Sequence, residues 1–175
     1  MTLVVDASVV VAALLHDGAT GEWAEEVILS DDLAAPHLMP AQVADIMRRA
    51  VDAGEISSDA ASLAHADLLR LRVALFPYEC IDGRAWELRE NLTTYDAWHV
   101  ALAEYLSADP ATLDARLSHA PGPTCGFMVP PRSSWGHPDP DLDPPHLWAR
   151  LIRSSRSPAA TPPASTPPTP PPPGA

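Results

Sequence analysis

Short apolar segments alternate with longer helix-like segments along the first 129 residues of this chain. The segment Leu3–Val5 is apolar and rich in β-branched residues, and it ends at Asp6. A run of this kind is typical of a strand that is buried on both faces of a sheet. Because helix-like segments of roughly 10 to 15 residues separate such runs, the sequence predicts an α/β fold around a mostly parallel sheet.

Capping residues, glycines and prolines set the expected boundaries of these elements. Strands are expected at 3–5, near 33–38, near 75, just before 114 and at 125–129. Helices are expected at 9–17 with Ser8 as the cap, at 21–30 with Thr20 as the cap, at 40–53, from about 58, at 83–91 with Asp82 as the cap, and at 95–108 with Thr93 or Thr94 as the cap. In this architecture, sites lie at the carboxyl ends of the strands.

The last quarter of the chain differs in composition. Fifteen of the 21 prolines lie at or beyond Pro130, and residues 157–175 are mainly proline, alanine, threonine and serine. Such a segment cannot bury enough apolar surface to offset the entropy lost on ordering. We therefore expect one folded domain, residues 1–130, followed by an irregular to disordered Pro-rich tail, residues 131–175. A polyproline ligand role for the tail is the alternative.

The expected domain is strongly acidic. Through Val129 there are 20 acidic residues against 7 arginines, a net charge of −13, and the chain contains no lysine. This balance argues against a broad basic face that holds nucleic acid, but not against an enzyme that meets phosphates through bound cations. It also suits a basic protein partner.

The amino-terminal apolar stretch does not predict a membrane protein. The segment "LVVDASVVVAALL" is too short to span a bilayer and carries Asp6 within it, and no basic residue precedes it as in a signal peptide. We therefore expect a cytoplasmic protein that makes no membrane contact, with Cys80 and Cys125 as free thiols.

Three acidic residues stand at the edges of expected elements. Asp6 ends the first strand, Asp96 opens the helix at 95–108, and Asp114 follows the strand-like "ATL" segment. Each one alone is explained as an acid at a helix start, which stabilises a helix by roughly 0.5–2 kcal/mol. Together they suggest a shared metal site, because strand ends converge on one edge of a parallel sheet. Clustered carboxylates repel each other, and bound Mg²⁺ or Mn²⁺ relieves that repulsion.

Four segments, in order and spacing, resemble the motifs of PIN-domain ribonucleases, and in particular the VapC-type toxins of bacterial toxin–antitoxin pairs. They are "VVDASVVVAALL", "APHLMPAQVADIMRRA", "RENLTTYDAWHVALAE" and "TLDARLSHAPG". The resemblance implies a PIN-like α/β/α sandwich and Mg²⁺- or Mn²⁺-dependent cleavage of RNA phosphodiester bonds by an endoribonuclease. It also implies a cognate antitoxin as partner, RNA as substrate and a homodimer.

The resemblance assigns roles residue by residue. Asp6, Asp96 and Asp114 match the family's metal-binding, catalytic aspartates, with Thr112 and Ser8 as supporting hydroxyls. The family usually has a glutamate on the third helix followed by an asparagine one turn later, where this chain has Gln42 and Asp45. Either of these residues is a candidate further ligand. Arg48 and Arg49 match a basic pair that is a candidate RNA contact.

The sequence leaves two alternative functions open. An amide such as Gln42 is a weaker ligand for a hard cation than a carboxylate, so the chain is alternatively a catalytically weakened or inactive PIN-like module that acts through partner binding. A phosphotransfer enzyme with Asp6 as nucleophile is a weaker alternative, because the aspartate expected two residues later is replaced by Ser8.

Overall fold

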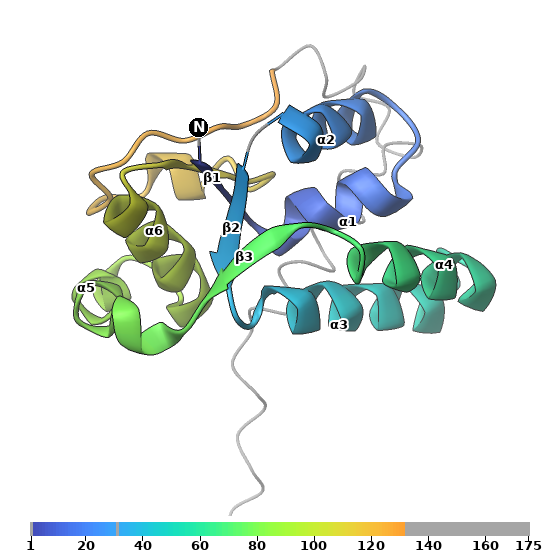
Figure 1. The fold of residues 1–175 in the computed structure, drawn as a ribbon, viewed down its shortest axis with the longest axis horizontal. Helices are drawn as coiled ribbons and strands as arrows, with labels where there is room; N and C mark the ends of the chain where they lie inside the picture. Colours follow the sequence, from blue (N-terminus) through green and yellow to red (C-terminus); the bar gives the residue numbers. More distant parts are fainter. Residues whose placement is uncertain (1, 31, 132–175) are drawn as a thin grey trace, which may run out of the picture.

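The computed structural model describes residues 2–30 and 32–131 as a three-layer α/β/α arrangement (Figure 1). The strands are β1 (Thr2–Val5), β2 (Asp32–Pro36), β3 (Val73–Phe76) and β4 (Asp109–Ala111). The helices are α1 (Ala7–Leu15), α2 (Ala19–Ser30), α3 (Met39–Asp52), α4 (Ser58–Leu68), α5 (Asp82–Glu87) and α6 (Thr94–Leu106), with short 3-10 turns η1 (Tyr78–Cys80), η2 (Leu88–Glu90) and η3 (Leu117–His119). The expected Pro-rich tail lies outside the described residues.

The four strands form one parallel sheet in the order β3-β2-β1-β4. Strand β1 is central: Val4 pairs with Ala34 of β2 on one side and with Pro110 of β4 on the other. The expected parallel α/β fold is thus confirmed.

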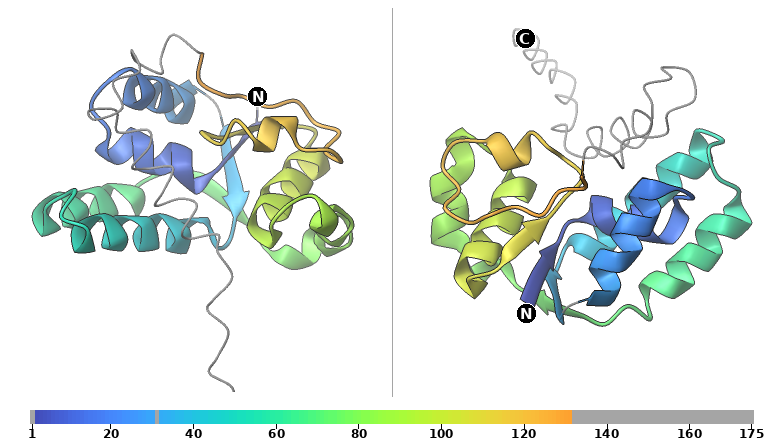
Figure 2. Two further views of the ribbon diagram at one scale, coloured as in Figure 1. Left: turned by 180° about the vertical axis from the view of Figure 1, so that it is seen from behind. Right: turned by 90° about the horizontal axis from the view of Figure 1, so that it is seen from above.

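Helices cover both faces of the sheet (Figure 2). Leu3, Val5 and Ala35 point into the core formed with α1, α2, α3 and α4. Val4 and Ala34 point the other way, into the core formed with α5 and α6. Successive residues of a strand face opposite sides, so both kinds of position must be apolar when both faces are buried. This explains why the strands read as continuous apolar runs.

Several boundaries differ from those expected. Asp6, not Ser8, is the N-cap of α1, since its side chain accepts a hydrogen bond from the Ser8 backbone N–H. Asp82 is the first residue of α5 and not its cap. Strand β4 ends at Ala111, and the chain then turns at Asp114, whose carbonyl accepts from the Leu117 N–H. Polar side chains thus directly follow β1 (Asp6) and β4 (Thr112).

The strand expected at 125–129 is reduced to one parallel bridge between Ala111 and Met128. The approach of this segment is close, because a Cβ built on Gly126 would lie 2.7 Å from Asp109 Oδ1. Among the described residues, no helix is long and apolar enough to cross a membrane.

Candidate active site

Asp6 lies where β1 ends and α1 begins. Its backbone is extended (φ −80°, ψ 151°), and its side chain is turned back over the first turn of the helix. The carboxylate accepts hydrogen bonds from the Ser8 N–H (3.4 Å to Oδ1) and the Ser8 hydroxyl (3.2 Å to Oδ2). Asp6 is 4% exposed, so these donors replace the water that the carboxylate loses on burial.

Thr112 joins this arrangement from the neighbouring strand end. Its hydroxyl donates to Asp6 Oδ2 at 2.9 Å, and the residue is fully buried. The pairing is fixed by the sheet, because the Asp6 N–H donates to the Ala111 carbonyl at 3.0 Å. The Ser8 oxygen in turn accepts from the Leu113 N–H at 3.2 Å. The structure thus brings Asp6, Ser8 and Thr112 together at the carboxyl edge of the sheet.

Asp96 lies in the first turn of α6 and is 8% exposed. Thr93 caps this helix: its oxygen accepts from the Asp96 N–H (3.3 Å), while its hydroxyl donates to Asp96 Oδ2 (2.8 Å). Two residues separate the end of helix α6 from the start of β4, at the amino edge of the sheet, and the helix packs along β1, β2 and β4. Its first turn therefore lies towards the carboxyl edge, the edge at which Asp6 lies.

Asp114 is held differently. It is partly exposed, and its Oδ1 accepts from the Arg116 N–H at 3.0 Å, as in a side-chain-capped turn. Its own N–H donates to the Thr112 hydroxyl at 3.1 Å. In residues 2–30 and 32–131, no group of three or more histidine, cysteine, aspartate or glutamate side chains is placed to hold a metal ion.

Gln42 and Asp45, the two candidate ligands on α3, lie in different environments. The Gln42 Oε1 atom is buried and has no hydrogen-bond partner among the residues that the structure describes. Asp45 is 46% exposed at its side chain and pairs with Arg48 (2.8 Å) and with Arg49 (3.2 Å). The hydrogen bond to Asp45, with further help from Asp52, raises the pKa of Arg48 above its usual value. Both arginines are therefore already engaged with acids of their own helix.

The chemistry of the donor set fits a hard divalent cation. Asp6 and Asp96 offer carboxylate oxygens, the ligands that Mg²⁺ and Mn²⁺ prefer, and both are buried and lie towards the carboxyl edge of the sheet. The Gln42 amide oxygen, buried without a partner, is a neutral oxygen of the same class. Sequence reasoning missed the bond from Thr93 to Asp96, although it considered Thr93 as a cap; a hydroxyl three residues before an acid at a helix start was the available signal.

Comparisons with known proteins agree with this architecture. Residues 3–123 match the model of the PIN domain family. Ribonuclease VapC9 of Mycobacterium tuberculosis is 38% identical over 130 residues, which cover 74% of this chain and 99% of that protein. Ribonuclease VapC1 of the same species is 40% identical over 127 residues, 72% of this chain and 96% of that protein.

A solved structure shows the same fold. The crystal structure of PAE2754 from Pyrobaculum aerophilum superposes with a TM-score of 0.57 at 21% identity, covering 87% of this chain and 90% of that one. The family match spans both halves of the sheet and each of the three aspartates. The chain therefore belongs to the PIN-domain family, and within it to the VapC-type ribonucleases.

Proposed function

We propose that this protein is a metal-dependent endoribonuclease that cleaves RNA phosphodiester bonds. The observation that carries the proposal is the buried Asp6 carboxylate, held by the hydroxyls of Ser8 and Thr112 at the sheet edge towards which Asp96 lies. Relatives that are 38% and 40% identical over most of their length are named ribonucleases. The same edge of the sheet is where α/β proteins bind ligands.

In this proposal Asp6 and Asp96 hold the cation, with Asp114 and Gln42 as further candidate oxygen donors. A bound Mg²⁺ or Mn²⁺ supplies an activated water and stabilises charge on the phosphate oxygens during in-line attack. Ser8 and Thr112 keep the Asp6 carboxylate in one orientation by donating to it. Hydrolysis adds the oxygen of water to phosphorus and breaks one P–O bond, and the released oxygen takes up a proton.

The test is cleavage of a panel of RNAs, transfer RNAs included, by the purified full chain with Mg²⁺, with Mn²⁺ and with a chelator. We expect cleavage with either metal and none with the chelator. An Asp6→Asn, Asp96→Asn double variant is the control against a contaminating nuclease. If the wild type cut no RNA under any of these conditions, the proposal would be wrong.

A second candidate is a PIN-like module with little or no catalysis, acting through a partner. The observation that favours it is Gln42, an amide where the family usually has a carboxylate. Calorimetric titration with Mn²⁺ separates the two candidates. Saturable binding supports the nuclease, and its absence supports the non-catalytic module.

For the partner, we infer a small antitoxin with a basic segment, encoded next to this gene. The inference rests on the relationship to VapC proteins and on the net charge of −13 over the first 129 residues. A neighbouring reading frame whose product co-purifies with this chain would support it. If the adjacent DNA encoded no such protein, the antitoxin proposal would fail while the nuclease proposal stood. Sedimentation of the purified chain tests the expected homodimer.

A further inference from the structure

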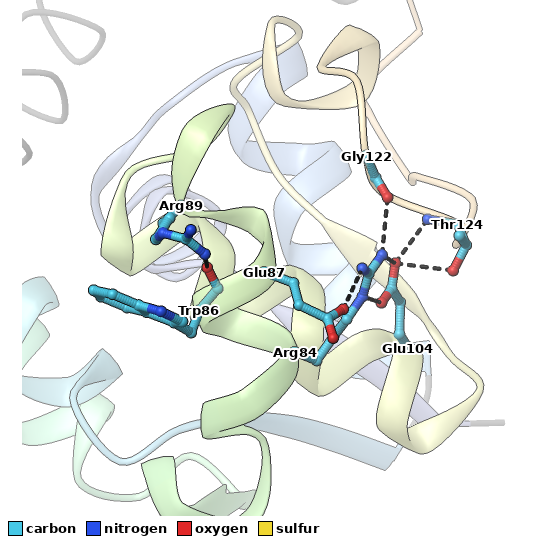
Figure 3. A network of polar contacts seen from close by, with 7 residues as sticks. All are labelled: Arg84, Trp86, Glu87, Arg89, Glu104, Gly122 and Thr124. Atoms are coloured by element: carbon cyan, nitrogen blue, oxygen red, sulfur yellow. Dashed lines mark hydrogen bonds and ion pairs between the residues drawn. The ribbon is translucent and has the colours of Figure 1, made fainter.

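An ion pair joins α5 to α6 far from the carboxyl edge of the sheet (Figure 3). Arg84 Nε donates to Glu104 Oε2 at 2.6 Å, and Arg84 Nη2 donates to Glu104 Oε1 at 3.1 Å. The Glu104 side chain is only 12% exposed. Arg84 also makes an exposed hydrogen bond, from its Nη1 to Glu87 Oε2 at 3.0 Å. Two parallel bonds between a guanidinium and a largely buried carboxylate fix both side chains.

The same ion pair holds the segment that follows η3. Glu104 Oε1 accepts from the Thr124 N–H (2.7 Å) and the Thr124 hydroxyl (2.9 Å). Arg84 Nη2 donates to the Gly122 carbonyl at 2.8 Å. Figure 3 shows these bonds converging on the two charged groups. Residues 122–124 are thus attached to α5 and α6 by side chains and not by secondary structure.

Four residues after Thr124, this segment reaches β4. The Met128 N–H donates to the Pro110 carbonyl at 2.9 Å, and the Thr112 N–H donates to the Met128 carbonyl at 3.1 Å. Thr112 is the residue whose hydroxyl donates to Asp6 Oδ2. Glu104 is therefore connected, through the contacts of residues 122–128, to the hydrogen bond that orients Asp6.

We propose that Glu104 is a positioning residue for the active site. By holding Thr124, it keeps the 122–128 segment against β4, which fixes Thr112 and through it the Asp6 carboxylate. Glu104 also lies on the same helix as Asp96. The pair with Arg84 therefore sets α6, which carries Asp96, relative to the end of β4, where the Thr112 hydroxyl donates to Asp6. This inference rests on the proposed function, because the residue that Glu104 helps to position, Asp6, belongs to the proposed metal site.

The test compares Glu104→Gln with Glu87→Gln in the full chain, at neutral pH and well below the melting temperature. Both changes remove one charge beside Arg84, but only the first touches Thr124. For Glu104→Gln we expect faster hydrogen exchange at the Thr112 amide, by a larger factor than at the amides of β1 and β2. We also expect the Kd for Mn²⁺ to rise about tenfold at unchanged stoichiometry, the effect typical of residues that orient metal ligands. Glu87→Gln should change neither quantity.

Two results would overturn the proposal. Unchanged Thr112 exchange in Glu104→Gln would show that the ion pair does not hold the strand end. An increase in exchange that is equal throughout the sheet, or a lower Mn²⁺ stoichiometry at unchanged Kd, would show loss of folded protein and nothing specific to the site. If the wild type bound no Mn²⁺ and cut no RNA, the nuclease proposal would fail, and Thr112 exchange alone would still decide whether Glu104 fixes this strand end.

Discussion

Asp6 has two roles that a single substitution can separate, since it caps α1 and carries a charge at the proposed site. Asparagine caps a helix about as well as aspartate does. Asp6→Asn should therefore leave the melting temperature nearly unchanged while lowering RNA cleavage by at least about 100-fold, because the amide is a poor ligand for a hard cation.

Asp6→Ala is the matched control, because it should lose cleavage and also about 1 kcal/mol of stability with the cap. Thermal unfolding and initial cleavage rates provide the two measurements. Near-wild-type cleavage by Asp6→Asn would remove Asp6 from the site.

Gln42 and Asp45 can be distinguished by the contacts of their side chains. Asp45 is paired with two arginines, whereas the Gln42 oxygen is buried without a partner. We therefore expect Asp45→Asn to leave the Kd for Mn²⁺ unchanged, and Gln42→Glu to tighten Mn²⁺ binding by adding a carboxylate to the donor set. Titration calorimetry on the wild type and both variants is the measurement. Weaker binding in Asp45→Asn would instead make Asp45 a ligand, directly or through a water.

At the scale of elements, the order of strands and helices could be predicted because apolar runs and helix signals are local. Strand β1 and helix α4 were expected within a residue or two of where they lie. The strand expected at 125–129 was wrong, since its apolar residues make one bridge, and the residues just before it, Gly122 and Thr124, are held by the side chains of Arg84 and Glu104. Glu104 and Arg84 are 20 positions apart in the sequence, so no local sequence pattern predicts that they pair. Whether Asp114 joins a metal site stays a prediction.

Helices α1 and α2 meet at a point where only glycine fits. A Cβ built on Gly21 would lie 1.8 Å from the His16 carbonyl oxygen, a backbone atom that cannot move aside without shifting the end of α1. Gly21→Ala should destabilise the protein by about 1–3 kcal/mol.

Gly83→Ala is the matched control, because Gly83 is also helical and a Cβ built on it would have no other atom within 4 Å beyond its own helix and chain neighbours. That change should be neutral or stabilising by up to about 1 kcal/mol. Urea unfolding measures both differences, and equal stability of the two variants would contradict the close approach of α1 and α2.

For the whole molecule, stability towards acid should depend on Glu104. Burial alone would raise its pKa, but the hydrogen bonds from Arg84 and Thr124 outweigh burial, so the pKa of Glu104 is lowered. The folded state thus binds this proton more weakly than the unfolded state. The stabilisation is complete above the ordinary carboxyl pKa of about 4.3 and is lost as the pH falls through the lowered value.

Glu104→Gln should therefore cost about 2 kcal/mol at neutral pH, and this cost should decrease as the pH falls below about 4.3, because the wild type then loses the stabilisation by the ionised Glu104. Unfolding by urea at neutral pH and below about pH 4.3 gives the comparison. A cost that stayed the same at both would show that the charge of Glu104 contributes nothing.

The central position of β1 has a consequence for synthesis on the ribosome. The first strand to emerge lies between β2 and β4, and β4 is the last strand to emerge. Asp6 meets the Thr112 hydroxyl across 106 positions of sequence, so the carboxyl edge stays unfinished until nearly the whole domain has been translated. A nascent chain that does not yet contain Thr112 therefore cannot assemble the proposed site.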